Sequence, residues 1–372
     1  MKRFYTVNGI RSIPEEEIGL IEEQAGEGDP LACYKLAQLH LAWHFESDYA
    51  ETAQDLLKKA QQGGIADADA AMALMYLRGE IEPYNPSEGA RLLEKAVKNE
   101  SGYAAFTHLC NMIYGRYGYT KNLELAIRIL DSFLEVEEDP YWYMLKGDAV
   151  YESGRREEAV YCYEKALEGG LTEVYSDLAV ARGLDPDGEL VDWDAYEDTL
   201  QEGMECEDMM CLHFTVLNKC SEYDECDPND DESRKMYRDF IVEGLEACAD
   251  DNIVASCELL GDIYREGLYD VPVDLIKAWK SYTKGSQYYK GSCFEKMYDM
   301  LLCDEIKLGS MTQQEAMDLC AINGARLHND AMIRATADAY MGGRLTQFAG
   351  EIEMYHLPAY NALPEDDEFL PH

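Results

Sequence analysis

Positively charged residues are scarce in this sequence of 372 residues. It contains 32 Lys and Arg against 74 Asp and Glu, which gives a net charge of −42. Such a chain repels the phosphates of nucleic acids and the headgroups of anionic lipids, so neither is an expected ligand. Three explanations of the acidity stay open: solubility, a basic partner, and adaptation to high salt. The abundant cysteines and lysines fit the salt explanation poorly.

Long apolar segments are missing as well. No run approaches the ~18 apolar residues that a membrane-spanning helix needs. Lys2 and Arg3 are not followed by the apolar stretch of a signal peptide. Most of the twelve cysteines stand singly in apolar helical patterns, which is typical of reduced thiols. The sequence therefore predicts a cytoplasmic protein without a membrane segment.

Motifs of catalysis are also missing from the sequence. It contains no G-x-S-x-G, no phosphate-binding loop, no G-x-G-x-x-G and no kinase or deaminase signature. No candidate nucleophile is paired with a base. We therefore predict that the chain is not an enzyme and that it needs no cofactor.

A two-helix pattern recurs through most of the chain. Its first helix carries a large apolar residue followed by a small one, as in Leu36-Ala37, Met72-Ala73, Leu109-Cys110, Leu178-Ala179, Leu260-Gly261 and Leu302-Cys303. Its second helix carries a small residue, an apolar pair three and four positions later, and another small residue at seven. This spacing is one face of an α-helix, and its small residues let two helices approach closely.

The position of the first small residue in the second helix marks a regular repeat, although two units have tyrosine there. Eight such markers are separated by 33 to 41 residues, namely Ala53, Gly89, Ala126, Ala159, Tyr196, Tyr237, Ala278 and Ala316. A unit of this length holds two helices and two turns. We therefore predict an all-α fold, an α-solenoid of about eight or nine antiparallel helix pairs.

The turn between the two helices is long in most units, and here the sequence resembles the Sel-one-like repeat family of the tetratricopeptide-like superfamily. The best match combines Leu260 to Gly267, Val271 to Asp274 and Ala278 to Gly285. The unit with Gly147, Gly154, Ala159, Tyr163 and Ala166 resembles an ordinary tetratricopeptide repeat. It departs from that pattern at Lys146, where a large apolar residue is expected. The resemblance implies a right-handed superhelix that binds proteins.

Three segments follow from these patterns. Residues 1–27 are expected to hold a capping helix that begins at a Ser12-Ile13-Pro14-Glu15 capping box. Residues 28–349 form the repeats, and residues 350–372 an acidic tail that contains prolines. The repeat units are expected near residues 28–64, 65–101, 102–139, 140–170, 171–205, 206–250, 251–290, 291–325 and 326–349.

The resemblance further implies that the first helix of each pair lines a concave groove. The positions that would point into it include Tyr34, Gln38, Leu74, Asn111, Asp148, Tyr151, Glu258, Asp262 and Arg265. This mixture suits hydrogen bonds and charge contacts with an extended or helical segment. The alternative interpretation is that these are ordinary surface residues.

The most acidic stretch lies in the sixth unit, between residues 222 and 232. Its carboxylates are Glu222, Asp224, Glu225, Asp227, Asp230, Asp231 and Glu232. One interpretation is a solvated loop, and the other is a docking site for a Lys/Arg-rich segment.

Two Cys and His groups have spacings that metal sites also use. Cys33, His40 and His44 share one helical face, but His40 stands where other units have Tyr76 and Tyr264, which favours packing. Cys206, Cys211, His213, Cys220 and Cys226 crowd together without a C-x-x-C, so ordinary thiols are the simpler interpretation of this group. We predict no metal site.

Taken with the resemblance, these patterns predict a scaffold or adaptor that holds a Lys/Arg-rich segment of another protein. The alternative is an acidic inhibitor or immunity-type protein that masks a basic toxin or a nucleic-acid-binding protein. A homo-oligomer is possible but not indicated.

Overall fold

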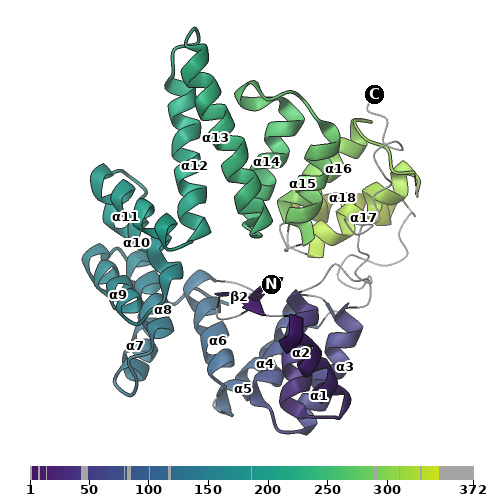
Figure 1. Cartoon of the computed structure of the whole chain (residues 1–372). Coiled ribbons are helices and arrows are strands. Elements are labelled where there is room, and N and C mark those ends of the chain that lie inside the picture. The colour runs from purple at the N-terminus through teal and green to yellow at the C-terminus, as the bar shows by residue number, and fades with distance from the viewer. Residues whose placement is uncertain are drawn as a thin grey trace. The chain divides into compact units, whose positions relative to one another are not determined.

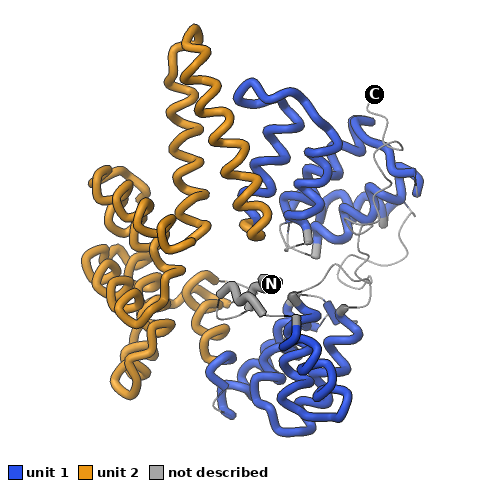
Figure 2. The backbone as a smooth tube through the Cα atoms, viewed as in Figure 1, with its two compact units in different colours: residues 1–104, 254–372 blue, residues 105–253 orange. Residues whose placement is uncertain are grey.

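The fold is taken from a computed structural model. It describes residues 2–6, 9–13, 15–42, 49–78, 80–81, 85–99, 101–115, 119–185, 187–287, 291–309, 311–326 and 329–342. The chain divides into two compact units (Figure 2). Unit 1 comprises residues 1–104 and 254–372, and unit 2 comprises residues 105–253.

A short β-hairpin precedes the helices. Strands β1 (Lys2–Thr6) and β2 (Gly9–Ile13) pair antiparallel, with Lys2 opposite Ile13 and Thr6 opposite Gly9. The first helix, α1 (Glu15–Gly26), therefore begins at Glu15 and not at Ser12, because Ser12 lies in a strand. The alternation in Tyr5-Thr6 and Ile10-Arg11 is too short a signal to predict a hairpin.

Every other named element is helical (Figure 1). Unit 1 holds α2 (Pro30–Ala42), α3 (Tyr49–Gln62), α4 (Ala66–Arg78), α5 (Pro86–Lys98), α14 (Val254–Glu266), η3 (Leu268–Asp270), α15 (Leu275–Gln287), α16 (Gly291–Leu302), α17 (Gln313–Arg326) and α18 (Asp330–Met341). Helix α6 (Gly102–Tyr114) spans the boundary. Unit 2 continues with α7 (Leu123–Leu134), α8 (Pro140–Glu152), α9 (Arg156–Glu168), η2 (Thr172–Val174), α10 (Tyr175–Gly183), α11 (Trp193–Glu205), α12 (Met209–Glu225) and α13 (Asp231–Asp250).

Most of the helices pack as successive antiparallel pairs, as α4 with α5 and α8 with α9, which confirms the predicted helical solenoid. We call the first helix of each pair the A helix (α2, α4, α6, α8, α10, α12, α14 and α16) and the second the B helix (α3, α5, α7, α9, α11, α13, α15 and α17). Each B helix also contacts the next A helix in most of the chain, as α7 contacts α8 and α9 contacts α10.

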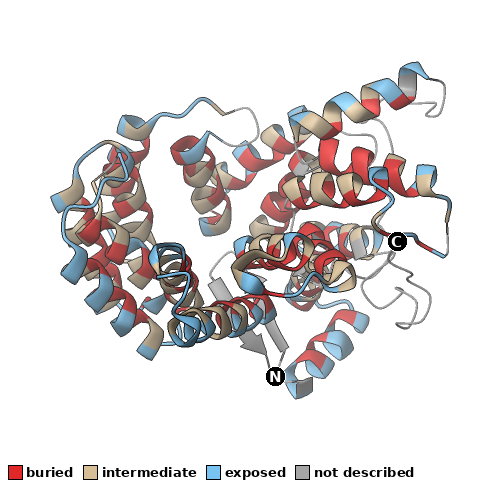
Figure 3. Cartoon of the chain, turned by 90° about the horizontal axis from the view of Figure 1, so that it is seen from above, coloured by how far each residue is buried: buried red, intermediate tan, exposed pale blue. Residues whose placement is uncertain are grey.

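The core lies between paired helices, where buried residues concentrate (Figure 3). The marker residues Ala53, Ala126, Ala159, Ala278 and Ala316 are fully buried, as expected of small residues at close helix contacts. One predicted core pair is wrong. Leu302 is the last residue of α16 and is 60% exposed, and Cys303 is also exposed.

Aspartate and asparagine side chains fix where many helices begin. Asn85, Asn122, Asp139, Asp192, Asp208 and Asp230 each accept a hydrogen bond from a backbone N–H in the first turn of the helix that follows. These N–H groups have no partner within the helix, and a carboxylate also suits the positive end of the helix dipole. Part of the chain's acidity therefore serves helix initiation.

Candidate functional site

A glycine on an A helix lets a tyrosine from the paired B helix reach across it. A Cβ added at Gly147 on α8 would lie 2.5 Å from Cε1 of Tyr163 on α9, so only glycine leaves room for the ring. The Tyr163 hydroxyl then donates to Asp148 Oδ1 at 2.9 Å. The buried ring thus holds the carboxylate that follows the glycine.

The same arrangement occurs in unit 1. Gly261 on α14 packs against the ring of Tyr282 on α15, and the Tyr282 hydroxyl donates to Asp262 Oδ1 at 2.6 Å. Burial and the neighbouring carboxylate raise the pKa of Tyr282 and of Tyr163, so both phenols stay protonated donors. Two predicted site residues, Asp148 and Asp262, therefore have the same local geometry.

Successive A helices are also joined by polar contacts between residues 34 positions apart. Tyr114 donates to Asp148 Oδ2 at 2.6 Å, and Lys296 donates to Asp262 Oδ1 at 2.8 Å. Further contacts with this spacing are Ser101 to Asp67, Tyr151 to the Asp185 carbonyl, and Asn329 to Glu295. The polar face of the A helices is thus held from one repeat to the next.

In unit 2 this face carries three neighbouring carboxylates, from Asp148, Asp177 and Asp208. Desolvation by the surrounding protein, and then the like charges of Asp148 and Asp208, raise the pKa of Asp177 well above its usual value, although its side chain is exposed. Burial likewise raises the pKa of Asp208, against hydrogen bonds that lower it. The mutual repulsion of these carboxylates and their burial therefore oppose full ionisation of the cluster.

The cluster is open to solvent at one side. Tyr114 is 40% exposed and Asp177 is exposed, whereas Asp208 is buried and accepts hydrogen bonds from the backbone N–H groups of Ser176 and Met210. Asp177 and Tyr114 therefore expose a carboxylate and an aromatic ring to solvent, with Asp148 held between the two tyrosine hydroxyls.

The other predicted groove positions are in varied surroundings. Leu74 and Asn111 are buried, with 8% and 2% of their surface exposed, so they pack inside the protein. Tyr34 and Gln38 are half-buried on α2, and burial raises the pKa of Tyr34. Tyr151 is half-buried and donates to the Asp185 carbonyl at 2.9 Å.

The predicted positions on α14 lie in a different ionic setting from those in unit 2. Arg265 pairs with Glu305, its Nε 2.8 Å from Oε2 and its Nη2 3.0 Å from Oε1. Asp262 is paired with Lys296. Glu258 is half-buried on the same helix. Because basic side chains already occupy this part of the face, it is a poorer cation site than the cluster of Asp148, Asp177 and Asp208.

The predicted acidic loop is shorter than residues 222–232. Glu222, Asp224 and Glu225 belong to the last turn of α12, and Asp231 and Glu232 begin α13. Asp227 and Asp230 lie in the turn, where Asp230 caps α13 and Asp227 accepts a hydrogen bond from the Asn229 backbone. The prediction missed these helix ends because runs of carboxylates resemble a solvated loop.

The Cys and His groups are dispersed. Cys33 is buried, its thiol 3.7 Å from the Ala25 carbonyl oxygen, and His40 lies on α2, while His44 falls outside the described residues. In the second group, Cys206 is exposed, whereas Cys211, His213 and Cys220 are buried and Cys226 is half-buried. Among the described residues, no three His, Cys, Asp or Glu side chains form a group that could hold a metal ion.

Sequence reasoning did not single out Tyr114, Asp177 or Asp208. Asp177 directly precedes the Leu178-Ala179 pair, and Tyr114 lies 34 residues before Asp148. The contact of Tyr114 with Asp148 spans the 34 positions that also separate Ser101 from Asp67 and Asn329 from Glu295. That signal becomes visible only once the register of the A helices is known.

Comparison with known proteins finds a family match over three parts of the chain. Residues 66–101, 145–171 and 254–286 match the Sel1 repeat family. A Sel1 repeat protein from Oxalobacter formigenes is similar in structure, with a TM-score of 0.42 and 15% identity over 87% of this chain and 90% of that one. The protective antigen c5321 of uropathogenic Escherichia coli, which displays an SLR fold, has a TM-score of 0.38 and 16% identity over 89% and 68%. No curated protein matches the sequence. None of the described helices is long and apolar enough to span a membrane.

Proposed function

Because the chain carries Sel1 repeats, which generally mediate protein–protein interactions, we propose that it is a non-enzymatic scaffold. Its partner is a protein segment rich in Lys and Arg. The segment binds to the A-helix face of unit 2, where Asp148, Asp177 and Asp208 lie.

One observation carries this proposal, namely the fixed position of Asp148. Two tyrosine hydroxyls, from Tyr114 and Tyr163, hold its two carboxylate oxygens. A carboxylate held in this way loses little side-chain entropy when a guanidinium or ammonium group binds, because its geometry is already set. Arg is the better fit, since it forms paired hydrogen bonds with carboxylates and stacks on aromatic rings such as Tyr114.

The charge of the whole chain favours the same class of partner. A net charge of −42 accelerates the approach of basic proteins and repels acidic ones. The like charges of Asp148 and Asp208 repel the charged form of Asp177 and help to raise its pKa. A bound cation relieves that repulsion, so its binding energy is concentrated at this cluster.

Affinity capture from native lysate, with the full chain as bait, tests the proposal. The wild-type bait and an Asp148→Asn/Asp177→Asn bait would be compared at low and moderate salt, with bound proteins identified by mass spectrometry. Glu137→Gln is the matched control, because Glu137 is an exposed carboxylate of unit 2 in the turn between α7 and α8.

We expect a protein with a basic segment that is recovered by the wild type and by Glu137→Gln and is lost with the double variant. Tyr163→Phe should weaken capture less, because it removes a positioning hydroxyl but no charge. Equal recovery by all baits, or no recovered partner at either salt concentration, would show that the face is not a binding site.

A further inference from the structure

The turn between α10 and α11 exposes three large apolar side chains. Leu190 is 56% exposed, Val191 54% and Trp193 39%. They lie close together in the sequence, whereas most exposed apolar residues of the chain stand singly. Exposed tryptophan beside aliphatic residues is typical of surfaces that a partner covers. We call residues 184–194, without the undescribed residue 186, the α10–α11 turn surface.

This surface is held in a defined conformation. Leu184 and Leu190 form an antiparallel bridge, and the Val191 N–H donates to the Gly183 carbonyl at 2.8 Å. The Asp185 side chain accepts from the N–H groups of Asp187 and Glu189. The hydroxyl of Tyr151 on α8 donates a hydrogen bond to the Asp185 carbonyl and so holds the turn against the neighbouring helix pair. The apolar side chains are thus presented on a preorganised turn, which lowers the entropy cost of binding.

The charge around these side chains has one sign. Between Arg182 and Lys219 the sequence contains eleven Asp and Glu and no Lys or Arg. Glu189, Asp192 and Asp194 alternate with Leu190, Val191 and Trp193, and all three carboxylates belong to exposed residues. One carboxylate oxygen of Asp192 already accepts a hydrogen bond from the Ala195 N–H, which caps α11. An apolar patch with this rim attracts a partner that is both apolar and cationic.

We propose that the α10–α11 turn surface is a docking site for a basic amphipathic segment of another protein. The apolar side chains of the segment cover Leu190, Val191 and Trp193, and its Lys or Arg residues pair with Glu189 and Asp194. A second copy of this chain is a poor occupant, because each copy has a charge of −42. The surface lies on a turn and not on the A-helix face, so this proposal does not depend on the proposed function above.

Two synthetic peptides test the site with the full chain. One is an amphipathic helix of Leu and Lys, and the other replaces every Lys by Glu. Fluorescence anisotropy measures the affinity of each, and hydrogen exchange with mass spectrometry locates the bound peptide. We expect the Leu/Lys peptide to bind and to protect backbone amides of residues 184–198, while the Leu/Glu peptide does not bind.

The decisive variant is Leu190→Ser/Val191→Ser, which removes apolar surface without touching the core. Val136→Ser is its control, since Val136 is 88% exposed in another turn of unit 2. We expect the first variant to bind the Leu/Lys peptide about tenfold more weakly, and the control to bind like the wild type. Circular dichroism checks that both variants keep their helices.

Equal affinity of the two variants for the Leu/Lys peptide, or protection confined to the A helices, would overturn the docking site. Protection on the A helices would leave the proposed scaffold intact, so the two failures are distinguishable. Concentration-dependent dimerisation through this turn, measured by analytical ultracentrifugation, would also overturn it in favour of a second copy as the occupant.

Discussion

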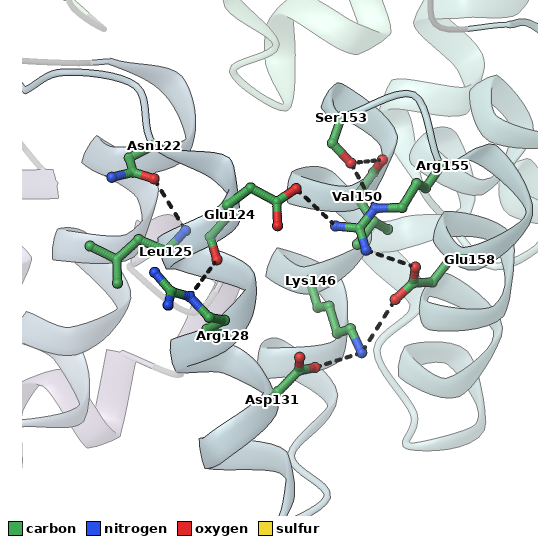
Figure 4. A network of polar contacts seen from close by, with 10 residues as sticks. All are labelled: Asn122, Glu124, Leu125, Arg128, Asp131, Lys146, Val150, Ser153, Arg155 and Glu158. Carbon is green, nitrogen blue, oxygen red and sulfur yellow. Dashed lines mark hydrogen bonds and ion pairs between the residues drawn. The ribbon is translucent and has the colours of Figure 1, made fainter.

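Lys146 Nζ lies 2.7 Å from Asp131 Oδ1 and so joins α8 to the B helix of the preceding pair (Figure 4). The same ammonium group is 3.5 Å from Glu158 Oε1 on α9. A large apolar residue is expected at this position of the repeat, and the lysine keeps only 18% of its side chain exposed. The aliphatic part packs as the apolar residue would, while the charged end connects three helices.

Replacement of Lys146 should therefore lower stability, and the loss should be larger when both the aliphatic packing and the ion pairs are removed. Lys146→Ala loses both packing and ion pairs, and we expect the free energy of unfolding to fall by about 1–2 kcal/mol. Lys146→Met keeps the aliphatic packing and should lose less. Urea unfolding measures both. Lys165→Ala is the control, because Lys165 contacts Glu168 and the Tyr161 ring within its own helix α9. An equal effect of the two alanine variants would mean that Lys146 adds nothing beyond a surface ion pair.

The contact of Gly147 with Tyr163 predicts a large effect of one methyl group. Gly147→Ala places a Cβ 2.5 Å from the Tyr163 ring, so the helices must separate or the ring must move away from Asp148. We expect a loss of about 2–3 kcal/mol in unfolding free energy. Gly102→Ala at the start of α6 meets no atom within 4 Å and should be neutral or slightly stabilising. Thermal unfolding that ranks the two variants equally would contradict the close packing.

Asp208 should give the wild type a distinctive dependence of stability on pH. Burial raises the pKa of its carboxyl above the ordinary 3.8. The ordinary value applies to the unfolded chain and the raised value to the folded chain. Between the two, the folded chain binds more protons, so the contribution of Asp208 to stability falls as pH rises above 3.8. Asp208→Asn keeps an oxygen to cap α12 but has no proton to lose. Urea unfolding from about pH 4 to about pH 7 should show the wild type losing stability relative to the variant; a constant difference would refute the shift.

The cysteines should divide sharply in reactivity. Cys206 and Cys303 are exposed, whereas Cys33, Cys162 and Cys320 are fully buried. Burial raises the pKa of Cys162 to about 11, which leaves little of the reactive thiolate near neutral pH. Brief treatment with iodoacetamide, followed by peptide mass mapping, should therefore label Cys206 and Cys303 first. The buried three should react only after unfolding. Rapid native labelling of Cys162 would contradict the packing of α8 on α9.

Much of the repeat architecture was predictable because it depends on short-range patterns. The small residues at Ala159 and Ala278 mark B helices by their spacing alone, and both are buried as expected. The prediction of a core pair at Leu302-Cys303 was wrong because an apolar residue followed by a small one also occurs at a helix end. The candidate site was only half predictable. Asp148 was found from its place in the repeat, but the tyrosines that hold it come from α6 and α9.

The helical repeat, its 33–41-residue interval and the excess of negative charge all follow from the order and composition of the amino acids. Periodicity and composition are local properties, and each repeat contacts mainly its neighbours. Which carboxylates lie close together depends instead on how the helices pack. Tyr163 and Asp148 are 15 positions apart and Tyr114 and Asp148 are 34, and these contacts depend on how closely α8 approaches its neighbours. That approach is set by the absence of a side chain at Gly147, and its consequence for Asp148 appears only when the helices are packed.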